Sequence, residues 1–354
     1  MNLYRVLGLM SGTSLDGLDI AQCTFKLIGK EWKYEIEKAT TYPYPNEWKN
    51  RLSNAETLSG LDLMLLHNDF GNLMGNWVNL FLVNNPEEID FIASHGQTIF
   101  HQPEKGLTLQ IGSGASIAAK TGITTICDFR TLDVALGGQG APLVPVGDKL
   151  LFGDYDYCLN LGGFANISYT DNSGIRLAYD ICPVNIVLNQ LVQERNLNYD
   201  PEGSIARAGN LNQPLLEELN NLAFYKMSGP KSLGKEWVLK VMLPTMQKIN
   251  ISLEDKLCTF CHHVMNQICN VIKYEGKGKI LITGGGTHNK FLLDLFLSDI
   301  KLNIVIPDKK VIDFKEALIF AFLGVLRFRD EVNCLSSVTG ARNDNVGGIV
   351  FKVM

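Results

Sequence analysis

A loop of small and hydroxyl-bearing residues follows the first apolar run of the chain. Residues 4–10 read YRVLGLM, and residues 11–19 continue as SGTSLDGLD. The backbone N–H groups and hydroxyls of such a loop suit phosphate, which accepts many hydrogen bonds and requires close backbone approach. Asp16 and Asp19 belong to this segment, and a carboxylate can work beside phosphate only through a metal ion or a proton. The pattern predicts a site for a nucleotide with Mg²⁺; the alternative is a tight β-hairpin whose hydroxyls cap their own turn.

A second glycine-rich loop follows Lys279 and the apolar residues 280–282. It reads Thr283-Gly284-Gly285-Gly286-Thr287, and three glycines allow a flat ligand to lie against the backbone without Cβ clashes. The alternative is a strand-to-helix turn in which Asn289 caps a helix over residues 290–298. A cap and a binding loop can coexist in one segment.

Alternating strands and helices must position these loops. We expect strands at residues 4–9, 17–25, 33–40, 89–93, 107–110 and 124–127, a long amphipathic helix at 61–83 and a short helix at 115–120. In open α/β sheets, ligands lie beyond the carboxyl ends of the strands. The polar residues at 95–98 and 128–130 follow two of these strands and are therefore candidates for a binding site.

A weak internal repeat indicates two domains. Residues 5–20 and residues 157–169 both have the pattern strand, glycine loop, strand. We expect the boundary within residues 143–156, which gives domains of residues 1–145 and 146–354. The apolar helix expected at residues 317–326 could pack back on the first domain.

Composition excludes several classes of function. The chain has 354 residues, of which 46% are hydrophobic, and a formal net charge of −5. These values allow a large core and argue against a nucleic-acid partner. No apolar run approaches the length of a membrane span, and the N-terminal residues lack the order of a signal peptide. We expect a cytoplasmic protein with no nucleic-acid or membrane partner.

Eight cysteines are scattered along the chain, with one close cluster at Cys258, Cys261 and Cys269. The Cys-x-x-Cys-His spacing in this cluster matches c-type haem attachment or half of a zinc site. However, apolar residues recur at helical spacing through residues 257–272, and the chain has no second Cys-x-x-Cys. The pattern favours a buried helix.

The ordered motifs of the chain resemble those of the anhydro-N-acetylmuramic acid kinases, which belong to the actin/hexokinase/Hsp70-like phosphotransferases. The resemblance covers nearly the whole chain and rests on residues 8–21 (GLMSGTSLDGLDIA), 94–98 (SHGQT), 128–130 (DFR), 137–145 (GGQGAPLVP), 160–167 (NLGGFANI), 283–289 (TGGGTHN) and 338–341 (VTGA). It implies an α/β, actin-like (ribonuclease H-like) two-domain kinase with a central cleft. It also implies ATP and Mg²⁺ as cofactors, an anhydro sugar as substrate, and a homodimer.

The resemblance assigns ATP and phosphate contacts to three loops. The residues implied are Gly12, Thr13, Ser14, Leu15, Asp16, Gly17, Leu18, Asp19, Gly162, Gly163, Asn166, Gly284, Gly285 and Gly286. Asp16 is the candidate for Mg²⁺ through water, because Mg²⁺ in such sites keeps most of its waters. Asp19 is expected to be structural.

The reaction that the resemblance implies needs a general base. Water must attack the anomeric carbon of a 1,6-anhydro sugar while ATP phosphorylates the oxygen released at C6, as in an inverting glycosidase. Asp180 matches the aspartate of the family's Asp-x-Gly-Pro-x-Asn segment and is the expected catalytic base. This chain has Cys182 where the family has glycine, and a side chain there would narrow the pocket floor or shift the loop. The alternative for Asp180 is a helix N-cap.

The sugar side of the site is expected to use His95, Gln97, Thr98, Arg130 and Glu316. Arg130 offers a fork for the lactyl carboxylate of a muramic acid, or it forms a local ion pair with Asp128 or Asp133. His95 alone could be a structural histidine, and Glu316 alone a charge at a helix N-terminus.

The implied activity is the hydrolytic opening and phosphorylation of 1,6-anhydro-N-acetylmuramic acid, which gives N-acetylmuramic acid 6-phosphate and ADP in cell-wall (peptidoglycan) recycling. Two alternatives stay open. One is a kinase of another 1,6-anhydro sugar such as levoglucosan, and the other is a non-catalytic nucleotide-dependent sensor, because a fold alone does not settle function.

Overall fold

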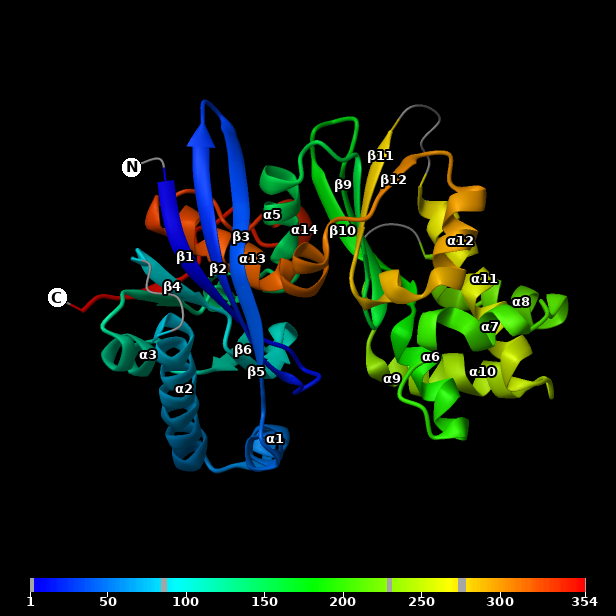
Figure 1. Cartoon of the computed structure of the whole chain (residues 1–354), viewed down its shortest axis with the longest axis horizontal. Helices are drawn as coiled ribbons and strands as arrows, with labels where there is room; N and C mark the ends of the chain where they lie inside the picture. Colours follow the sequence, from blue (N-terminus) through cyan, green and yellow to red (C-terminus); the bar gives the residue numbers. More distant parts are fainter. Residues whose placement is uncertain (1–2, 84–87, 228–230, 273–277, 354) are drawn as a thin grey trace. The chain divides into compact units, whose positions relative to one another are not determined.

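The computed structural model describes residues 3–83, 88–227, 231–272 and 278–353. The chain divides into two compact units (Figure 1): unit 1 comprises Met1–Leu151 and Phe314–Met354, and unit 2 comprises Phe152–Asp313. The change of unit after Leu151 falls within the segment expected for the boundary. The units differ from the expected domains of residues 1–145 and 146–354, because residues 146–151 and the whole segment from Phe314 onward belong to unit 1.

Unit 1 contains a mixed sheet of six strands among the described residues. Their order is β13 (Ile349–Phe351), β7 (Thr125–Cys127), β4 (Phe91–Ser94), β1 (Leu3–Ser11), β2 (Gly17–Ile28) and β3 (Glu31–Pro43). β1, β2 and β3 form an antiparallel meander, and β4 and β7 continue the sheet parallel to β1. A separate hairpin pairs β5 (Gln97–Gln102) with β6 (Leu107–Ile111).

The sheet of unit 2 repeats this arrangement. Its order over the part of the chain that is described is β10 (Arg176–Pro183), β9 (Phe164–Thr170), β8 (Tyr157–Leu161), β11 (Lys279–Thr283) and β12 (Asn303–Val305). β8, β9 and β10 form an antiparallel meander, and β11 and β12 continue parallel to β8. The repeat predicted from two hairpins therefore extends over five strands in each unit. This shared order confirms the α/β, actin-like (ribonuclease H-like) fold class.

Helices cover the strands of both units. Those of residues 1–151 and 314–354 are α1 (Asn46–Ser53), α2 (Gly60–Val83), α3 (Gly114–Thr121), α4 (Thr131–Ala135), α5 (Val144–Leu151), α14 (Ser336–Thr339) and α13 (Lys309–Phe328), which lies in unit 1 from Phe314 onward. Those of unit 2 are α6 (Asn185–Val192), α7 (Ser204–Ala208), α8 (Gln213–Asn220), α9 (Lys235–Trp237), α10 (Leu243–Gln247), α11 (Leu253–Val271) and α12 (Lys290–Asp299). Over the described ranges, none of the helices combines the length and the apolar character that a membrane span requires.

Most of the predicted elements are present. The helices expected at residues 61–83, 115–120, 290–298 and 317–326 are α2, α3, α12 and α13, and the strands expected at 4–9, 17–25, 33–40, 107–110 and 124–127 are β1, β2, β3, β6 and β7. The strand expected at residues 89–93 begins only at Phe91. Element boundaries depend on pairing partners, which local sequence does not specify.

Strand β1 separates two layers of unit 1. Leu7 and Leu9 belong to a buried cluster that includes Phe70 and Met74 of α2. Gly8 faces the other side, where a Cβ would lie 2.0 Å from the carbonyl oxygen of Ala317 in α13. Since side chains alternate across a strand, α2 and α13 cover opposite faces of the sheet, and only glycine allows α13 to approach so closely.

Helix α11 belongs to the core of unit 2. Cys258 and Cys261 are free thiols and are buried, and Cys261 is part of the main hydrophobic cluster of this unit. The thiols therefore serve as small apolar side chains. The prediction of a buried helix for this segment is confirmed.

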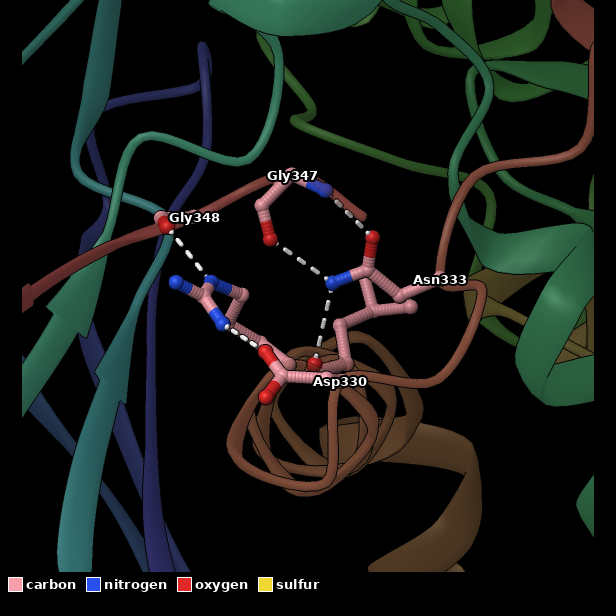
Figure 2. A network of polar contacts seen from close by, with 6 residues as sticks. Asp330, Asn333, Gly347 and Gly348 are labelled. Atoms are coloured by element: carbon pink, nitrogen blue, oxygen red, sulfur yellow. Dashed lines mark hydrogen bonds and ion pairs between the residues drawn. The ribbon is translucent and has the colours of Figure 1, made fainter. Parts of the chain in front are cut away.

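The C-terminal segment is tied to α13 by a polar network (Figure 2). The side-chain amide of Asn333 donates to the carbonyl of Gly347, and the N–H of Gly347 donates back to Asn333 Oδ1, both at 2.8 Å. Arg327 Nε donates to the carbonyl of Gly348 at 2.9 Å. β13 then follows and pairs with β7. These contacts give the physical reason why the end of the chain belongs to unit 1.

Candidate active site

The loop between β1 and β2, residues 12–16, is anchored at its base by a buried serine. Ser11 Oγ donates to Oε1 of Gln97 and accepts a hydrogen bond from the Tyr44 hydroxyl at 2.7 Å. Leu15 adopts a left-handed backbone conformation with φ of 56°, and its N–H donates to the carbonyl of Gly12 at 3.2 Å. The sequence analysis did not select Ser11 or Tyr44. Only the position of Ser11 at the carboxyl end of a strand could have indicated it.

The two aspartates near this loop have different surroundings. Thr41 Oγ1 donates to Asp19 Oδ1 at 2.5 Å, across the paired strands β2 and β3. Asp16 is exposed, and its carboxylate has no hydrogen-bond or ion-pair partner among the described residues. One free carboxylate fits a Mg²⁺ ion that is held mainly by water and phosphate. The described part of the chain contains no group of three or more His, Cys, Asp or Glu side chains that could hold a metal alone.

The glycine loop of unit 2, Gly162–Gly163, is attached to the start of helix α6. The carbonyl of Gly163 accepts from the N–H of Val184 at 2.8 Å, and the carbonyl of Gly162 accepts from the N–H of Asn185 at 3.3 Å. The side-chain amide of Asn185 also donates to the carbonyl of Leu161 at 3.2 Å. The first N–H groups of α6 therefore hold the loop in place.

Three polar residues form a row across adjacent strands of unit 2. Asn166 on β9 pairs with Asn160 on β8 and with Asp180 on β10. Paired residues of antiparallel strands place their side chains on one face of the sheet. The register thus places two predicted residues, Asn166 and Asp180, beside each other and adds Asn160, which the sequence did not indicate.

The third loop rests on the end of β8. Gly284 has a φ of 88°, and a Cβ on it would lie 2.8 Å from the carbonyl carbon of Leu161. A Cβ on Gly286 would lie 2.7 Å from Leu161 Cβ. Asn289 Oδ1 accepts from the N–H of Leu292 at 2.9 Å, so the predicted cap of α12 is present. The segment therefore forms the predicted strand-to-helix turn, and this turn is compatible with ligand binding by the same loop.

One glycine in each loop has no steric reason to be glycine. A Cβ on Gly12 would meet only Ser14 Oγ at 3.7 Å, one on Gly163 only Ile186 Cβ at 3.9 Å, and one on Gly285 only Asn185 Nδ2 at 3.8 Å. None of the three has a positive φ. The space above these backbones is open, which is the arrangement that a closely approaching ligand needs.

Asp180 lies at a β-bulge in β10 rather than at a helix N-cap. The register of β10 against β9 shifts between Asp180 and Cys182, and the N-cap of α6 is Val184. Asp180 Oδ2 accepts from the N–H of Leu233 at 2.9 Å and from Ser232 Oγ at 3.3 Å, whereas Oδ1 has no partner among the described residues. Desolvation by burial raises the pKa of the carboxyl, and the two hydrogen bonds oppose this shift.

Cys182 belongs to the core of unit 2. Its side chain is fully buried in the hydrophobic cluster of unit 2. The bulge after Asp180 gives the two residues separate environments, one polar and one apolar. The core therefore accommodates the departure from the family's glycine, and the expectation that Cys182 narrows the pocket floor or shifts the loop stays a prediction.

His95 and Arg130 form a buried pair in unit 1. Arg130 Nε donates to His95 Nε2 at 3.0 Å, and His95 Nδ1 lies 2.9 Å from the carbonyl of Gly96. A guanidinium can only donate, so His95 is neutral and carries its proton on Nδ1. Burial and the charge of Arg130 lower the pKa of His95, in agreement with this state. Both ring nitrogens are occupied, so His95 orients Arg130 and has no nitrogen left for a sugar.

The guanidinium of Arg130 is partly free. Its Nη1 donates to the carbonyl of Gly140 at 2.6 Å, while Nη2 has no partner among the described residues. Burial lowers the pKa of Arg130 to about 10, and the charge of Glu316 opposes this shift. The group is still charged near neutral pH, and it can offer the outer N–H groups of Nη1 and Nη2 to an anion.

The alternative of a local ion pair for Arg130 is not present. Asp128 has a φ of 58°, and its Oδ1 accepts from the N–H of Thr131, the first residue of α4, at 3.2 Å. Asp133 is fully buried and accepts from other groups. Within the described ranges, neither aspartate pairs with Arg130.

Helix α13 brings Glu316 toward this pair. Phe320, one helical turn after Glu316, packs on the His95 ring with centroids 4.5 Å apart. Glu316 is exposed, yet nearby protein atoms displace enough water to raise the pKa of its carboxyl, against the opposing charge of Arg130. Asp19 raises this pKa further, which places a β2 carboxylate near the same group.

Gln97 and Thr98 lie at the start of β5. Gln97 is buried and its Oε1 accepts from Ser11, so it supports the loop between β1 and β2. Thr98 is half-buried, and its hydroxyl accepts from Gln110 Nε2 at 3.4 Å. The structure thus brings His95, Arg130, Glu316 and Gln97 together in unit 1, with Thr98 on the adjoining hairpin.

Two units of the same strand order, each with a glycine loop between its first two strands, define the actin-like fold. The model of the family described as "Anhydro-N-acetylmuramic acid kinase" matches residues 4–353. The anhydro-N-acetylmuramic acid kinase of Pseudoalteromonas translucida is 37% identical over 318 residues, which cover 81% of this chain and 79% of that protein. Those of Vibrio cholerae and Sulfurovum sp. are 34% and 33% identical, covering 98% and 99% of this chain and 97% and 100% of theirs. The chain belongs to the anhydro-N-acetylmuramic acid kinase family and is a kinase.

Proposed function

We propose that this kinase phosphorylates 1,6-anhydro-N-acetylmuramic acid while opening its anhydro ring. Water forms a bond to C1, the C1–O6 bond breaks, O6 bonds to the γ-phosphorus of ATP, and the bond from that phosphorus to the bridging oxygen of ADP breaks. The proton of the attacking water goes to a base. The products are N-acetylmuramic acid 6-phosphate and ADP, which would serve peptidoglycan recycling.

Asp180 is the proposed base, and its environment is the observation that carries the ring-opening step. One carboxylate oxygen is held by Leu233 and Ser232, while the other has no partner among the described residues. A carboxylate that is fixed through one oxygen can use its other oxygen to accept a proton from a water molecule on a defined side. Its raised pKa makes it a stronger base than an exposed aspartate.

The three glycine loops are proposed to bind ATP. Gly12, Gly163 and Gly285 have open space where a Cβ would stand, which supports close approach of phosphate or adenosine to the backbone. The exposed Asp16 is the residue that would hold Mg²⁺ through water. Bound Mg²⁺ would neutralise phosphate charge, and the chain's own loops would orient the nucleotide.

Arg130 is proposed to bind the lactyl carboxylate. The pair with His95 and the bond to Gly140 orient the guanidinium, and no carboxylate of the described residues forms an ion pair with it. A buried guanidinium without a carboxylate partner favours an anionic ligand. Glu316, close to Arg130, is proposed to accept hydrogen bonds from sugar hydroxyls or the amide.

The decisive experiment measures ADP release with Mg-ATP in the presence of 1,6-anhydro-N-acetylmuramic acid, levoglucosan or no sugar. We expect release only with the muramic sugar, together with a ring-opened 6-phosphate product identified by mass spectrometry and NMR. Release with levoglucosan alone would move the specificity to another anhydro sugar. Tight ATP binding with no release in any reaction would favour the nucleotide-dependent sensor.

A homodimer, which the family resemblance implies, and a cytoplasmic location, which the sequence predicts, complete the proposal. Size-exclusion chromatography with light scattering would show a mass of twice the monomer if this is right. A monomer that retains full activity would contradict the dimer without affecting the proposed reaction.

A further inference from the structure

Asp133 is a buried carboxylate that the proposed reaction does not use. It lies in α4, is fully buried, and has no Lys or Arg partner in the described part of the chain. Its oxygens instead accept hydrogen bonds from four neutral groups. These are the N–H of Gly140 at 2.8 Å, Thr339 Oγ1 at 2.8 Å, Asn345 Nδ2 at 2.9 Å and the thiol of Cys334 at 3.0 Å. Burying a carboxylate costs free energy unless hydrogen bonds of this kind compensate for the lost water. The position of Asp133 inside the protein therefore indicates a specific role.

Gly140 connects Asp133 to Arg130. Its N–H donates to Asp133 Oδ2, and its carbonyl accepts from Arg130 Nη1 at 2.6 Å. Gly140 has a φ of 65°, and a Cβ on it would lie 2.7 Å from Val134 Cγ2 and 3.5 Å from Arg130 Cβ. Gly140 is therefore held on both sides, at its N–H by Asp133 and at its carbonyl by Arg130.

The C-terminal segment completes this arrangement. Thr339 and Asn345 reach Asp133 from a part of the chain more than 200 positions away. The carbonyl of Thr339 also accepts from the N–H of Gln139 at 2.8 Å, in the same glycine loop as Gly140. The loop is thus fastened both to Asp133 and to the segment that the network of Figure 2 ties to α13.

We propose that Asp133 is a positioning residue that orients Arg130 through Gly140 for the carboxylate of the sugar. His95 holds the Nε side of the guanidinium, and the Gly140 carbonyl holds Nη1. The outer N–H groups of Nη1 and Nη2 then face a carboxylate as a two-pronged donor. Asp133 acts indirectly, because it orients the carbonyl of Gly140, and this carbonyl orients Arg130. This inference rests on the proposed role of Arg130.

A double-mutant cycle tests the proposal. Dissociation constants for 1,6-anhydro-N-acetylmuramic acid and for Mg-ATP are measured for the wild type, Asp133→Asn, Arg130→Ala and the double variant. Asp133→Asn replaces one acceptor oxygen by an amide that must face donors, so sugar binding should weaken by about tenfold while ATP binding is unchanged. The double variant should bind the sugar no more weakly than Arg130→Ala, since both changes remove one interaction.

Asn333→Ala is the matched control. It removes buried hydrogen bonds from the same C-terminal segment without touching Asp133, so it should lower stability and leave sugar affinity unchanged. If Asp133→Asn does not fold, Thr339→Val should weaken sugar binding and Thr339→Ser should restore it, because serine keeps the hydroxyl that reaches Asp133.

The outcomes separate the two levels of the proposal. If Arg130→Ala leaves sugar binding intact, the role of Arg130 fails and the inference fails with it. If Arg130→Ala weakens binding but Asp133→Asn and Thr339→Val do not, only the inference is overturned. Independent, additive losses in the double variant would likewise show that Asp133 does not act through Arg130.

Discussion

At the residue scale, the site depends on which atoms are occupied by the protein and which are left for ligands. His95 has both ring nitrogens engaged, whereas Asp180 keeps one oxygen and Arg130 keeps one nitrogen free of described partners. The same distinction applies to the glycines, since Gly284 is required by packing and Gly285 is not. Polar atoms without a protein partner are candidates for binding ligands. Polar atoms that already bond to the protein position the neighbouring side chains.

Asp180→Asn should abolish most turnover and leave binding intact. An amide has nearly the same shape but cannot take a proton from water, so kcat should fall by about 10²–10⁴-fold. ATP and sugar dissociation constants, measured by calorimetry, should stay near the wild-type values. Asp171→Asn, in the turn between β9 and β10, is the matched control and should keep full kcat. A wild-type kcat for Asp180→Asn would remove Asp180 from the mechanism.

Ser232→Ala should shift the pH dependence of kcat/KM toward higher pH. The hydroxyl of Ser232 donates to Asp180 and thereby lowers the pKa of that carboxyl. Without this bond the pKa rises, so Asp180 becomes protonated, and inactive as a base, at a higher pH than in the wild type. Rates measured across the acidic limb would show the shift. A limb displaced to lower pH would contradict the assignment.

Gly284→Ala and Gly285→Ala should separate stability from nucleotide binding. Gly284 has a positive φ and no room for a Cβ, so alanine there should lower the free energy of unfolding by about 1–3 kcal/mol. Gly285 has open space, so alanine should leave stability unchanged but weaken ATP binding by roughly tenfold, about 1.4 kcal/mol. Thermal unfolding and ATP titration would measure both. Unchanged ATP binding for Gly285→Ala would argue against this loop as a nucleotide site.

At the element scale, α13 is the helix on which unit 1 depends. It approaches β1 at Gly8, and its Phe322 packs on Phe25 of β2 and Trp32 of β3 at centroid distances of 5.3 and 5.2 Å. Phe320 of the same helix supports His95. One helix therefore contributes both to the core and to the position of the proposed sugar-binding groups.

The start of α13 in unit 1 carries a buried ion pair. Lys315 Nζ lies 2.8 Å from Asp148 Oδ1 of α5, and the two side chains are only 8% and 5% exposed. Removing one partner leaves a buried charge, so Lys315→Ala or Asp148→Ala should cost about 3–5 kcal/mol of unfolding free energy. The double change Lys315→Met/Asp148→Leu should cost less than the sum of the single changes. Denaturant titration would show it, and fully additive losses would mean that the pair is not coupled.

At the scale of the whole molecule, each unit has its own hydrophobic cluster. The cluster around Leu159 and Phe260 contains only residues of unit 2, and the cluster around Leu9 and Phe70 contains only residues of unit 1. Unit 2 is continuous in sequence, whereas unit 1 needs the segment from Phe314 onward. A unit with a complete core can fold by itself.

The fragment of residues 152–313 should therefore fold cooperatively, and the fragment of residues 1–151 should not. The first contains all strands of its sheet, while the second lacks α13 and β13. Circular dichroism and denaturant unfolding of both fragments would check this. Addition of residues 314–354 through a short linker should restore cooperative unfolding to the second fragment. A stable, cooperative 1–151 fragment would show that α13 is dispensable for this core.

The sequence by itself determined the features that depend on neighbouring residues. Apolar periodicity and glycine position predicted β1, β2, α2, α12 and the buried helix α11. Apolar residues recur about every second residue in a strand and about every 3.6 residues in a helix, so their spacing indicates both the element and its buried face. The loops at Gly12, Gly163 and Gly285 and the candidate base Asp180 were also indicated by local motifs, and their proposed roles stay predictions.

Only the tertiary structure decided which distant residues meet. The partner of Arg130 is His95, 35 positions away, rather than the nearby Asp128 or Asp133, and Asp133 bonds Asn345, 212 positions away. The strand register placed Asn166 between Asn160 and Asp180, and it turned Cys182 into the core. These outcomes depend on pairing and packing between segments, which are set by the burial of whole faces and not by the local chain.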